Sequence, residues 1–454
     1  MSLGAIGLKK AVPVFVLLAC TSLGFISCGG GSTKKIPPSG IHTRVMVSQS
    51  VSSAATSGGL FIINAEDDTL ARSSELPAGV SPGLLVPSPT LATLLAFDSI
   101  GKSVQVVNTT TEANVGGISL AGGETTSIAF PATSSIAYAA VPSATNNLWA
   151  APGAIDVLNL ANGTVQTAIG VPNAQTVTGN SNGNQLLVFS SGSNLVSVIS
   201  PFNAVPPADQ GCNTAPNGVC VIIPGFDRPV NAVYSGNTAY ILNCGAQCGG
   251  TQASVSVFDL TSLTITATIP VNGATMALLS GSTLYVAGLG TPTGPKCTSI
   301  KSAAQTAATY CGTLDIVNLS TLQDPYFNNP ASEIAITDGY HDRMDMGQAG
   351  QLFIGSNDCT NVGDVNNPNG EVRGCLSIYN TANNSVVIPP DNGDVTGLQG
   401  FISRYVEYVV EGGNLRIYCT AANADDNCPT ADALQTMQIT LRGYMVDVKA
   451  VDNF

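Results

Sequence analysis

A short segment in the last third of the chain holds the densest group of side chains that could do acid–base chemistry. Residues 340–346 read YHDRMDM and contain one of only two histidines in 454 residues. An imidazole between carboxylates can act as a general base or a metal ligand, because it exchanges protons near neutral pH. His341, Asp342 and Asp345 are therefore the candidate catalytic residues. The alternative is structural: a hydrogen-bonded channel wall, or an Asp–Arg pair that locks neighbouring modules together.

A second group of polar side chains could bind a cation. Residues 357–371 are rich in carboxylates and amides, and the strongest candidate ligands there are Asp358, Asp364, Asn366 and Glu371. Oxygen ligands suit Ca²⁺, which makes calcium the one cofactor that the sequence allows. The spacing does not match an EF-hand loop, and ordinary turn chemistry explains the same composition. With two histidines in the chain, a multi-histidine metal centre is not expected.

The cysteines fall into couples that are close together in the sequence. Leaving aside Cys20 and Cys28 near the N-terminus, the remaining ten are Cys212 with Cys220, Cys244 with Cys248, Cys297 with Cys311, Cys359 with Cys375, and Cys419 with Cys428. An even number of cysteines in an exported chain is typical of disulfides, and short separations favour pairing within each couple. A zinc site at Cys244 and Cys248 is the alternative, but no second Cys or His couple lies nearby. We expect five disulfides that staple surface loops.

The N-terminus has the pattern of an export signal. Lys9 and Lys10 precede an apolar run over residues 11–27, which is short for a membrane span and suits a signal-peptide core. Cys28 follows a small residue and precedes Gly29, so this segment resembles a bacterial lipoprotein signal in which Cys28 becomes the lipidated first residue. An ordinary cleaved signal with an incidental cysteine is the alternative.

The segment after Cys28 predicts a tether and not a folded element. Residues 29–40 are Gly, Ser, Lys and Pro with little apolar character, which is typical of a flexible linker. We therefore divide the chain into a signal peptide (1–27), a tether (28–42) and one folded domain (43–454). The expected location is the cell envelope, at the outer membrane or cell surface, with the lipid as the only membrane attachment.

The charge of the chain excludes one class of partner. The formal net charge is −13 and only 10% of residues are charged, with no cluster of Lys and Arg. A nucleic-acid-binding surface requires a basic patch, so nucleic acid is not expected as a partner. Solubility must depend on Asn, Ser, Thr and Gly.

The elements that must position these residues are short strands in repeated groups of four. One group covers residues 127–130, 136–140, 155–160 and 164–169, with β-branched residues in alternation and turns rich in Gly, Asn and Ser. A four-stranded module repeated roughly every 40 to 60 residues indicates the blades of an all-β propeller. In that fold the first strand of each module lines a central channel, which places residues 340–346 there.

Module boundaries can be set near residues 80, 124, 174, 229, 274, 333 and 394. An opening fragment supplies three further strands, over residues 44–48, 59–64 and 69–76, and the C-terminal run 444–451 can provide its missing fourth. Joining the two ends of the chain in one blade removes an exposed sheet edge. This count predicts eight blades, with seven as the alternative.

The third strands carry a family resemblance. Residues 102–109 (KSVQVVNT), 254–261 (SVSVFDLT) and 375–381 (CLSIYNT) resemble the YVTN-type propeller repeat, although the Tyr-Val-Thr-Asn motif itself is absent. The resemblance extends over most of residues 43–442 and implies the fold, while members of that class include adhesins and lactonase-like or quinoprotein-like enzymes.

Two functions follow as hypotheses. The preferred one is a monomeric, non-catalytic binding or scaffold protein that engages an envelope protein or glycan through the stapled loops of the later modules. The alternative is a lactonase-like or quinoprotein-like enzyme that works through the channel around His341. The sequence contains no nucleophile elbow, phosphate-binding glycine loop or zinc-protease motif, which favours the first hypothesis.

Overall fold

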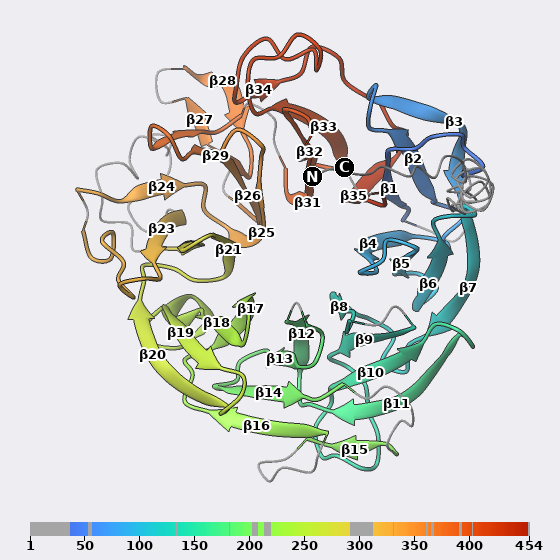
Figure 1. The fold of residues 1–454 in the computed structure, drawn as a ribbon, viewed down its shortest axis with the longest axis vertical. Coiled ribbons are helices and arrows are strands. Elements are labelled where there is room, and N and C mark those ends of the chain that lie inside the picture. The colour runs from blue at the N-terminus through green and yellow to red at the C-terminus, as the bar shows by residue number, and fades with distance from the viewer. Residues whose placement is uncertain are drawn as a thin grey trace, which may run out of the picture. The chain divides into compact units, whose positions relative to one another are not determined.

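Residues 37–454 form one compact unit in the computed structural model. The residues that the structure describes are 37–52, 57–132, 135–180, 182–201, 208–212, 219–290, 312–329, 331–359, 362–364, 367–389, 393–401 and 403–452. Eight sheets of four antiparallel strands are arranged in a ring around a central axis, so the fold is an eight-bladed β-propeller (Figure 1). The predicted fold class and the preferred blade number are confirmed.

Each blade runs from an inner strand beside the channel to an outer strand at the rim. The inner strands are β35 (Tyr444–Ala450), β4 (Pro82–Pro87), β8 (Ser127–Ala129), β12 (Ala174–Gly179), β17 (Pro229–Ser235), β21 (Met276–Ser280), β25 (Tyr340–Met346) and β31 (Val395–Gly400). The second strands are β1 (Arg44–Ser50), β5 (Thr93–Asp98), β9 (Ile136–Val141), β13 (Leu186–Ser190), β18 (Thr238–Asn243), β22 (Thr283–Leu289), β26 (Gln351–Asn357) and β32 (Val406–Glu411).

The third and fourth strands complete the blades. The third strands are β2 (Leu60–Asn64), β6 (Ser103–Asn108), β10 (Ala154–Asn159), β14 (Leu195–Ile199), β19 (Ser254–Asp259), β23 (Gly312–Asn318), β29 (Leu376–Asn380) and β33 (Asn414–Cys419). The outer strands are β3 (Thr69–Leu76), β7 (Ala113–Ser119), β11 (Thr164–Gly170), β16 (Cys220–Pro224), β20 (Thr264–Pro270), β24 (Ile334–Ile336), β30 (Ser385–Val387) and β34 (Ala433–Leu434).

The core lies between neighbouring blades, because each sheet is covered on both faces. In β9 every residue is buried, and its side chains alternate between two neighbours as the two-residue period of a strand requires. Ala137 and Val141 pack toward the β4–β7 blade, whereas Tyr138 and Ala140 pack toward the β12–β16 blade. Strand β9 therefore reads as a continuous apolar run, IAYAAV.

The two ends of the chain meet in one blade, as predicted. Strand β35 pairs antiparallel with β1, with Val45 opposite Ala450 and Val47 opposite Val448. Arg44 at the start of β1 forms an ion pair of 2.8 Å with Asp452, just after the end of β35. This closure leaves no open edge in the ring.

Four of the five expected disulfides are present: Cys212–Cys220, Cys244–Cys248, Cys359–Cys375 and Cys419–Cys428. The fifth couple, Cys297 and Cys311, and the proposed lipid site Cys28 lie outside the described residues. The only helix in the described part of the chain is the 3-10 turn η1 (Gly245–Cys248), and no helix there is long and apolar enough to cross a membrane.

Two short strand elements are added to the regular blades. Strand β15 (Gln210–Gly211) pairs parallel with β11 of the preceding blade, and the Cys212–Cys220 disulfide ties it to the start of β16. A Cβ atom on Gly211 would contact the Trp149 side chain, so this loop tryptophan packs beneath β15. Strands β27 (Val362–Asp364) and β28 (Asn367–Arg373) form a separate hairpin.

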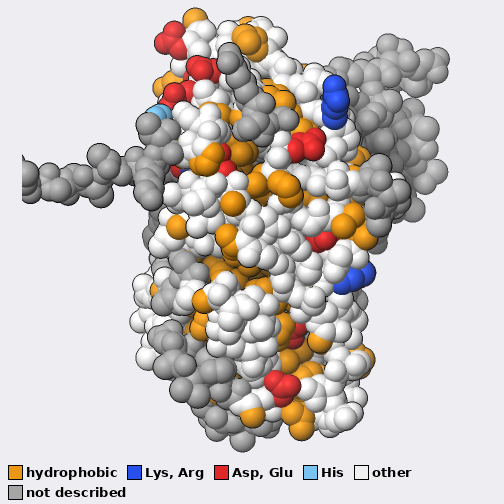
Figure 2. Space-filling view, turned by 90° about the vertical axis from the view of Figure 1, so that its right-hand side faces the viewer, with side chains coloured by type: hydrophobic (Ala, Val, Ile, Leu, Met, Phe, Trp, Pro, Cys, Tyr) orange, Lys and Arg blue, Asp and Glu red, His pale blue; other side chains and the backbone are white. Residues whose placement is uncertain are grey.

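The disc has two distinct faces, set by the direction of the inner strands. All inner strands begin on one face, here the strand-start face, and end on the other, the strand-end face, because the blades repeat the same up-and-down order. Residues 37–43 reach the disc on the strand-end face, where Ser39 donates a hydrogen bond to Glu112 (2.6 Å). The rim on the β3 and β7 side shows mostly uncharged side chains with isolated acidic and basic groups (Figure 2).

Candidate functional site

His341 lies on the inner strand β25, as predicted, but its ring is fully buried. The Nε2–H group donates to the carbonyl oxygen of Thr337 at 2.9 Å, since a carbonyl can only accept. Burial lowers the pKa of His341 to about 4, so the ring is neutral at physiological pH. A Cβ atom on Gly312 would lie 2.7 Å from the ring, which shows how closely the preceding blade covers it.

The two candidate carboxylates have other partners. Asp342 forms an ion pair with Arg343 (3.1 Å) and accepts a hydrogen bond from Asn357 (2.8 Å). Burial raises the pKa of Asp342, although Arg343 opposes the effect. Asp345 accepts the backbone N–H of Gly400 in the next inner strand at 2.8 Å. No hydrogen bond joins any two of the three candidates among the described residues. Asp345 bonds the next blade, whereas Asp342 is held by residues of its own blade.

The candidate calcium ligands are only partly described. The Asp358 side chain is exposed, and its backbone N–H donates to Asp394 at 2.8 Å. Asp364 and Glu371 lie in β27 and β28, their side chains are outside the described part of the chain, and Asn366 is not described. Among the side chains that are described, no group of three His, Cys, Asp or Glu residues could hold a metal ion. The calcium site remains a prediction.

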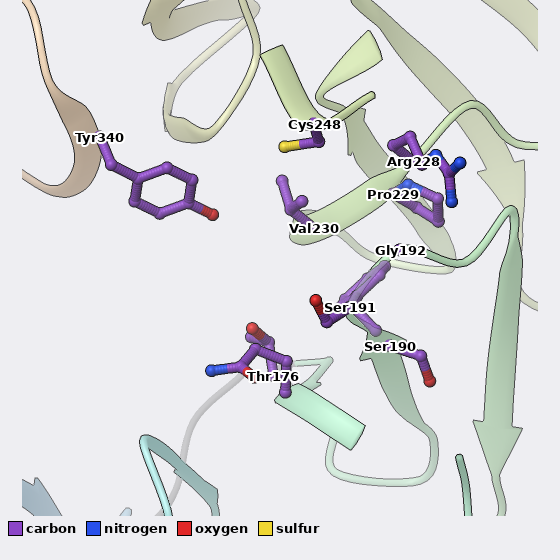
Figure 3. Close-up of a pocket in the computed structure, with 11 residues that line it drawn as sticks. Thr176, Ser190, Ser191, Gly192, Arg228, Pro229, Val230, Cys248 and Tyr340 are labelled. Atoms are coloured by element: carbon purple, nitrogen blue, oxygen red, sulfur yellow. The ribbon is translucent and has the colours of Figure 1, made fainter. Parts of the chain in front are cut away.

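A pocket of about 320 Å³ lies at the mouth of the channel on the strand-start face. Three blades build it, from the start of their inner strands and the loops beside them (Figure 3). Gln175 and Thr176 come from β12, Ser191 follows β13, and Arg228 with Val230 comes from the start of β17. Cys248 of the stapled loop and Tyr340 of β25 also line it.

Local structure fixes the Arg228 side of the pocket. Arg228 has a φ of 59°, a left-handed conformation that is uncommon for a residue other than Gly. Its carbonyl accepts the N–H of Cys244 at 2.9 Å, so the disulfide to Cys248 constrains the same loop. Pro229 then opens β17, a strand position that tolerates the missing N–H of proline. Turn, disulfide and proline together hold Arg228 at the rim.

The Arg228 guanidinium has Asp227 as an electrostatic partner, and its charge helps to lower the pKa of that carboxylate. Its Nε atom is buried, and no described residue accepts a hydrogen bond from its side chain. The neighbouring carboxylate of Asp227 instead accepts the backbone N–H groups of Thr251 and Gln252, both at 2.8 Å. Burial raises the pKa of Asp227, but these hydrogen bonds outweigh it and hold the pKa below its usual value. The pocket lining therefore includes one cation, which interacts with Asp227 and whose buried Nε has no acceptor among the described residues.

Tyr340 forms the opposite wall. Its hydroxyl points into the space bounded by Val230, Ser191 and Thr176 (Figure 3). The side chain is 41% exposed, which is high for an aromatic ring on an inner strand. Desolvation, with a contribution from Asp342, raises the pKa of Tyr340 to about 12, so the phenol stays neutral. A neutral aromatic group thus borders a cavity whose lining is largely apolar.

Sequence patterns identify Tyr340 only as part of residues 340–346 and do not identify Arg228. The sequence feature that points to Arg228 is its position at a module boundary, directly before the proline that opens an inner strand. The pocket itself brings together residues that are up to 165 positions apart, from Gln175 to Tyr340, which no local pattern encodes.

Comparisons with known proteins support the fold, and they support no particular family or function. No protein-family model matches the sequence, and no curated protein matches it. The dihydro-heme d1 dehydrogenase NirN superposes with a TM-score of 0.55 at 10% identity, covering 90% of this chain and 75% of that one. The computationally designed Ika8 protein gives 0.51 at 9% identity, covering 85% and 99%.

A third solved structure is a candidate 6-phosphogluconolactonase from Bacteroides fragilis, with a TM-score of 0.50 at 12% identity, covering 90% of this chain and 98% of that one. At such low identities these likenesses show a shared propeller architecture, which also occurs in proteins of unrelated function.

Proposed function

We propose that this protein is a non-catalytic binding protein of the cell envelope, anchored through a lipid on Cys28, that recognises an envelope glycan or protein with its strand-start face. The observation that supports this most directly is the pocket at the channel mouth, built by three blades and bounded by a disulfide-stapled loop. Binding sites are concave, largely preformed and lined by a few well-placed polar groups, as this one is.

The cysteines support an exported location. Four disulfides in the described residues fit an oxidising compartment, since such bonds are rare in the cytosol. The chain joins the disc on the strand-end face, opposite the pocket. The point where the chain enters the disc therefore does not obstruct the pocket.

The enzymatic alternative has less support from the geometry. A general base must reach its substrate, and the His341 ring is fully buried with Nε2 committed to Thr337. Asp342 is engaged by Arg343 and Asn357. Neither residue belongs to the pocket lining, so catalysis around His341 would need a rearrangement of β25.

The proposal is tested with the full chain purified in detergent on arrays of glycans and envelope proteins. We expect specific binding that Ser191→Trp abolishes, because the indole would fill the cavity. Ser262→Trp, in an exposed turn far from the pocket, is the matched control. Absence of binding to any arrayed class, or binding that is equal in both variants, would contradict the proposal.

A further inference from the structure

Two carboxyl groups meet where the β17–β20 blade passes into the β21–β24 blade. Asp315 lies in β23 and is fully buried, and Asp324 lies in the loop that follows β23. We infer that these two carboxyls share one proton, and that the shared proton is a pH-sensitive latch that holds residues 319–329 against the blades. Residues 319–329 are called the latch loop below.

The latch loop lies outside the regular sheet. Strand β24 pairs with the first three residues of β23, and the latch loop follows the last residue of β23. Two backbone hydrogen bonds between Asn318 and Gln323 close its first turn. Beyond that turn, the Asn272 side chain donates to the carbonyl of Tyr326 and accepts the N–H of Asn328, both at 3.2 Å. Side chains, and not a strand ladder, therefore attach this part of the loop.

The hydrogen bonds of Asp315 are those of an ionised carboxylate. Its oxygens accept the backbone N–H of Asn272 at 2.7 Å, the side-chain amide of Asn272 at 2.6 Å and the N–H of Gly273 at 3.4 Å. Asn272 and Gly273 lie between β20 of one blade and β21 of the next, so this carboxyl also fixes the connection between the two blades. Three N–H donors favour the charged form of a carboxyl.

One oxygen of Asp324 receives no such donor. Its Oδ1 accepts the N–H of Tyr326 at 2.9 Å, whereas Oδ2 is buried and receives no hydrogen bond from the described residues. The side chains of Asp324 and Asp315 lie within hydrogen-bonding reach of each other. Two ionised carboxylates can only accept, so a hydrogen bond between them requires a proton on one of the two. Because Oδ2 is closed to solvent, a proton can satisfy it and a water-sized ligand cannot.

The surroundings favour one shared proton over two negative charges. Burial, and then the Asp324 carboxyl, raise the pKa of Asp315 to about 8, although the N–H donors oppose them, and burial also raises the pKa of Asp324. No described Lys or Arg is among the main influences on either carboxyl. The other titratable groups at this boundary are the phenols of Tyr285, Tyr326 and Tyr379, which act on one another. Adjacent carboxylates without a cation repel, so the pair titrates as one unit.

The closed loop therefore binds one more proton than the open loop over a defined pH range. An exposed Asp carboxyl has a pKa of about 4, so this range extends from about pH 4 to about pH 8. Within it, each unit of pH should raise the opening constant of the loop about tenfold, and above it the loop is least tightly held. The latch loop lines a cavity of about 510 Å³ together with Ile269 and Pro270 at the end of β20, so its release would open that cavity at alkaline pH.

The test is amide hydrogen exchange of the full chain in detergent, measured by mass spectrometry from about pH 6 to about pH 9 and corrected for the intrinsic pH dependence of exchange. We expect protection of the wild-type latch loop to fall at least about tenfold between pH 6 and 8, relative to β22 of the same blade. Asp324→Asn replaces the shared proton with an amide N–H that can donate to Asp315, so its loop should stay protected throughout. Asp425→Asn, in an exposed turn of another blade, is the control and should behave as the wild type does.

A second variant keeps the inference falsifiable if Asp324→Asn fails to fold. Asp324→Ala removes one carboxyl and supplies no donor, so its loop should be weakly protected already at pH 6 and lose little more at pH 8. Wild-type protection of the latch loop that does not change with pH would overturn the inference. A fall with pH that persists in Asp324→Asn or Asp324→Ala would overturn it as well, because another group would then be responsible.

Discussion

His341 and Arg228 show how burial decides the role of a polar side chain. Both lie at the start of an inner strand on the same face of the disc. The imidazole is enclosed by the preceding blade and hydrogen-bonded to Thr337, so its role is structural. The guanidinium is held at the rim of a cavity, where it interacts electrostatically with Asp227.

The buried imidazole predicts a pH dependence of stability. Burial lowers the pKa of His341 to about 4, below its unfolded value near 6.5, so the unfolded state binds more protons between these pH values. The contribution of His341 to the free energy of unfolding is fully present above about pH 6.5. It should fall by about 3 kcal/mol as the pH drops to 4. In urea titrations at a series of pH values, His341→Gln should lose this slope, with His42→Gln as control. An unchanged slope in His341→Gln would show that other groups cause it.

Asp156 predicts a slope of opposite sign. It is fully buried in β10, and burial, with a contribution from Asp209, raises its pKa to about 6. The folded state therefore binds more protons between about pH 4 and 6, so this group costs stability as pH rises through that window. Asp156→Asn should raise the free energy of unfolding at pH 7 by about 2 kcal/mol and have little effect at pH 4. Exposed Asp67→Asn is the control; a destabilised Asp156→Asn at pH 7 would contradict the assignment.

At the scale of elements, polar side chains on one inner strand accept N–H groups from the next. Asp345 of β25 accepts from Gly400 of β31, and Asp447 of β35 accepts from Leu85 of β4 at 2.9 Å. Ser127 of β8 accepts the N–H of Val177 in β12 in the same way. The inner strands belong to different sheets, so these side chains supply hydrogen bonds between blades that the sheets themselves cannot.

Removal of one such acceptor should weaken the closed ring. Asp447 is buried and also accepts the backbone N–H of Val448 and the Lys449 ammonium, at 2.8 and 2.9 Å. Asp447→Ala would leave the Leu85 N–H and the Lys449 ammonium without this partner, so we expect a loss of about 2 to 4 kcal/mol in urea unfolding. Exposed Asp67→Ala should change stability by less than about 1 kcal/mol. Equal effects of the two variants would show that the inter-blade bonds do not stabilise the ring.

At the scale of the whole molecule, one buried network secures the closure of the ring. Arg404, in the last complete blade, bonds both oxygens of Asp68 in the closing blade at 2.6 and 2.7 Å, and also bonds Asp426 at 2.8 Å. Tyr408 and Gln435 donate to the same Asp68 carboxylate. Burial raises the pKa of Asp68, but these donors outweigh it and keep the pKa below its usual value. The two ends of the chain are thus joined by side chains as well as by the β1–β35 pairing.

Loss of this network should open the ring at its closing blade. Arg404→Leu would leave the buried Asp68 carboxylate without its cation, which costs about 3 to 5 kcal/mol. We expect a lower urea midpoint and faster proteolysis near β1 and β35 than in the wild type. Lys102→Leu, which removes an exposed ion pair with Glu124, is the control and should change little. Proteolysis that begins elsewhere would place the weak point of the ring outside the closing blade.

Local sequence pattern predicts the propeller, the preferred count of eight blades, the shared closing blade and four described disulfides, because each depends on alternation, turn residues or cysteine spacing. The burial of His341 and the meeting of Arg228 and Tyr340 at the edge of one pocket depend on the tertiary structure. The physical reason is that burial and charge pairing are set by residues of other blades, more than a hundred positions away, whose approach depends on how the closed ring packs and not on any neighbouring residue.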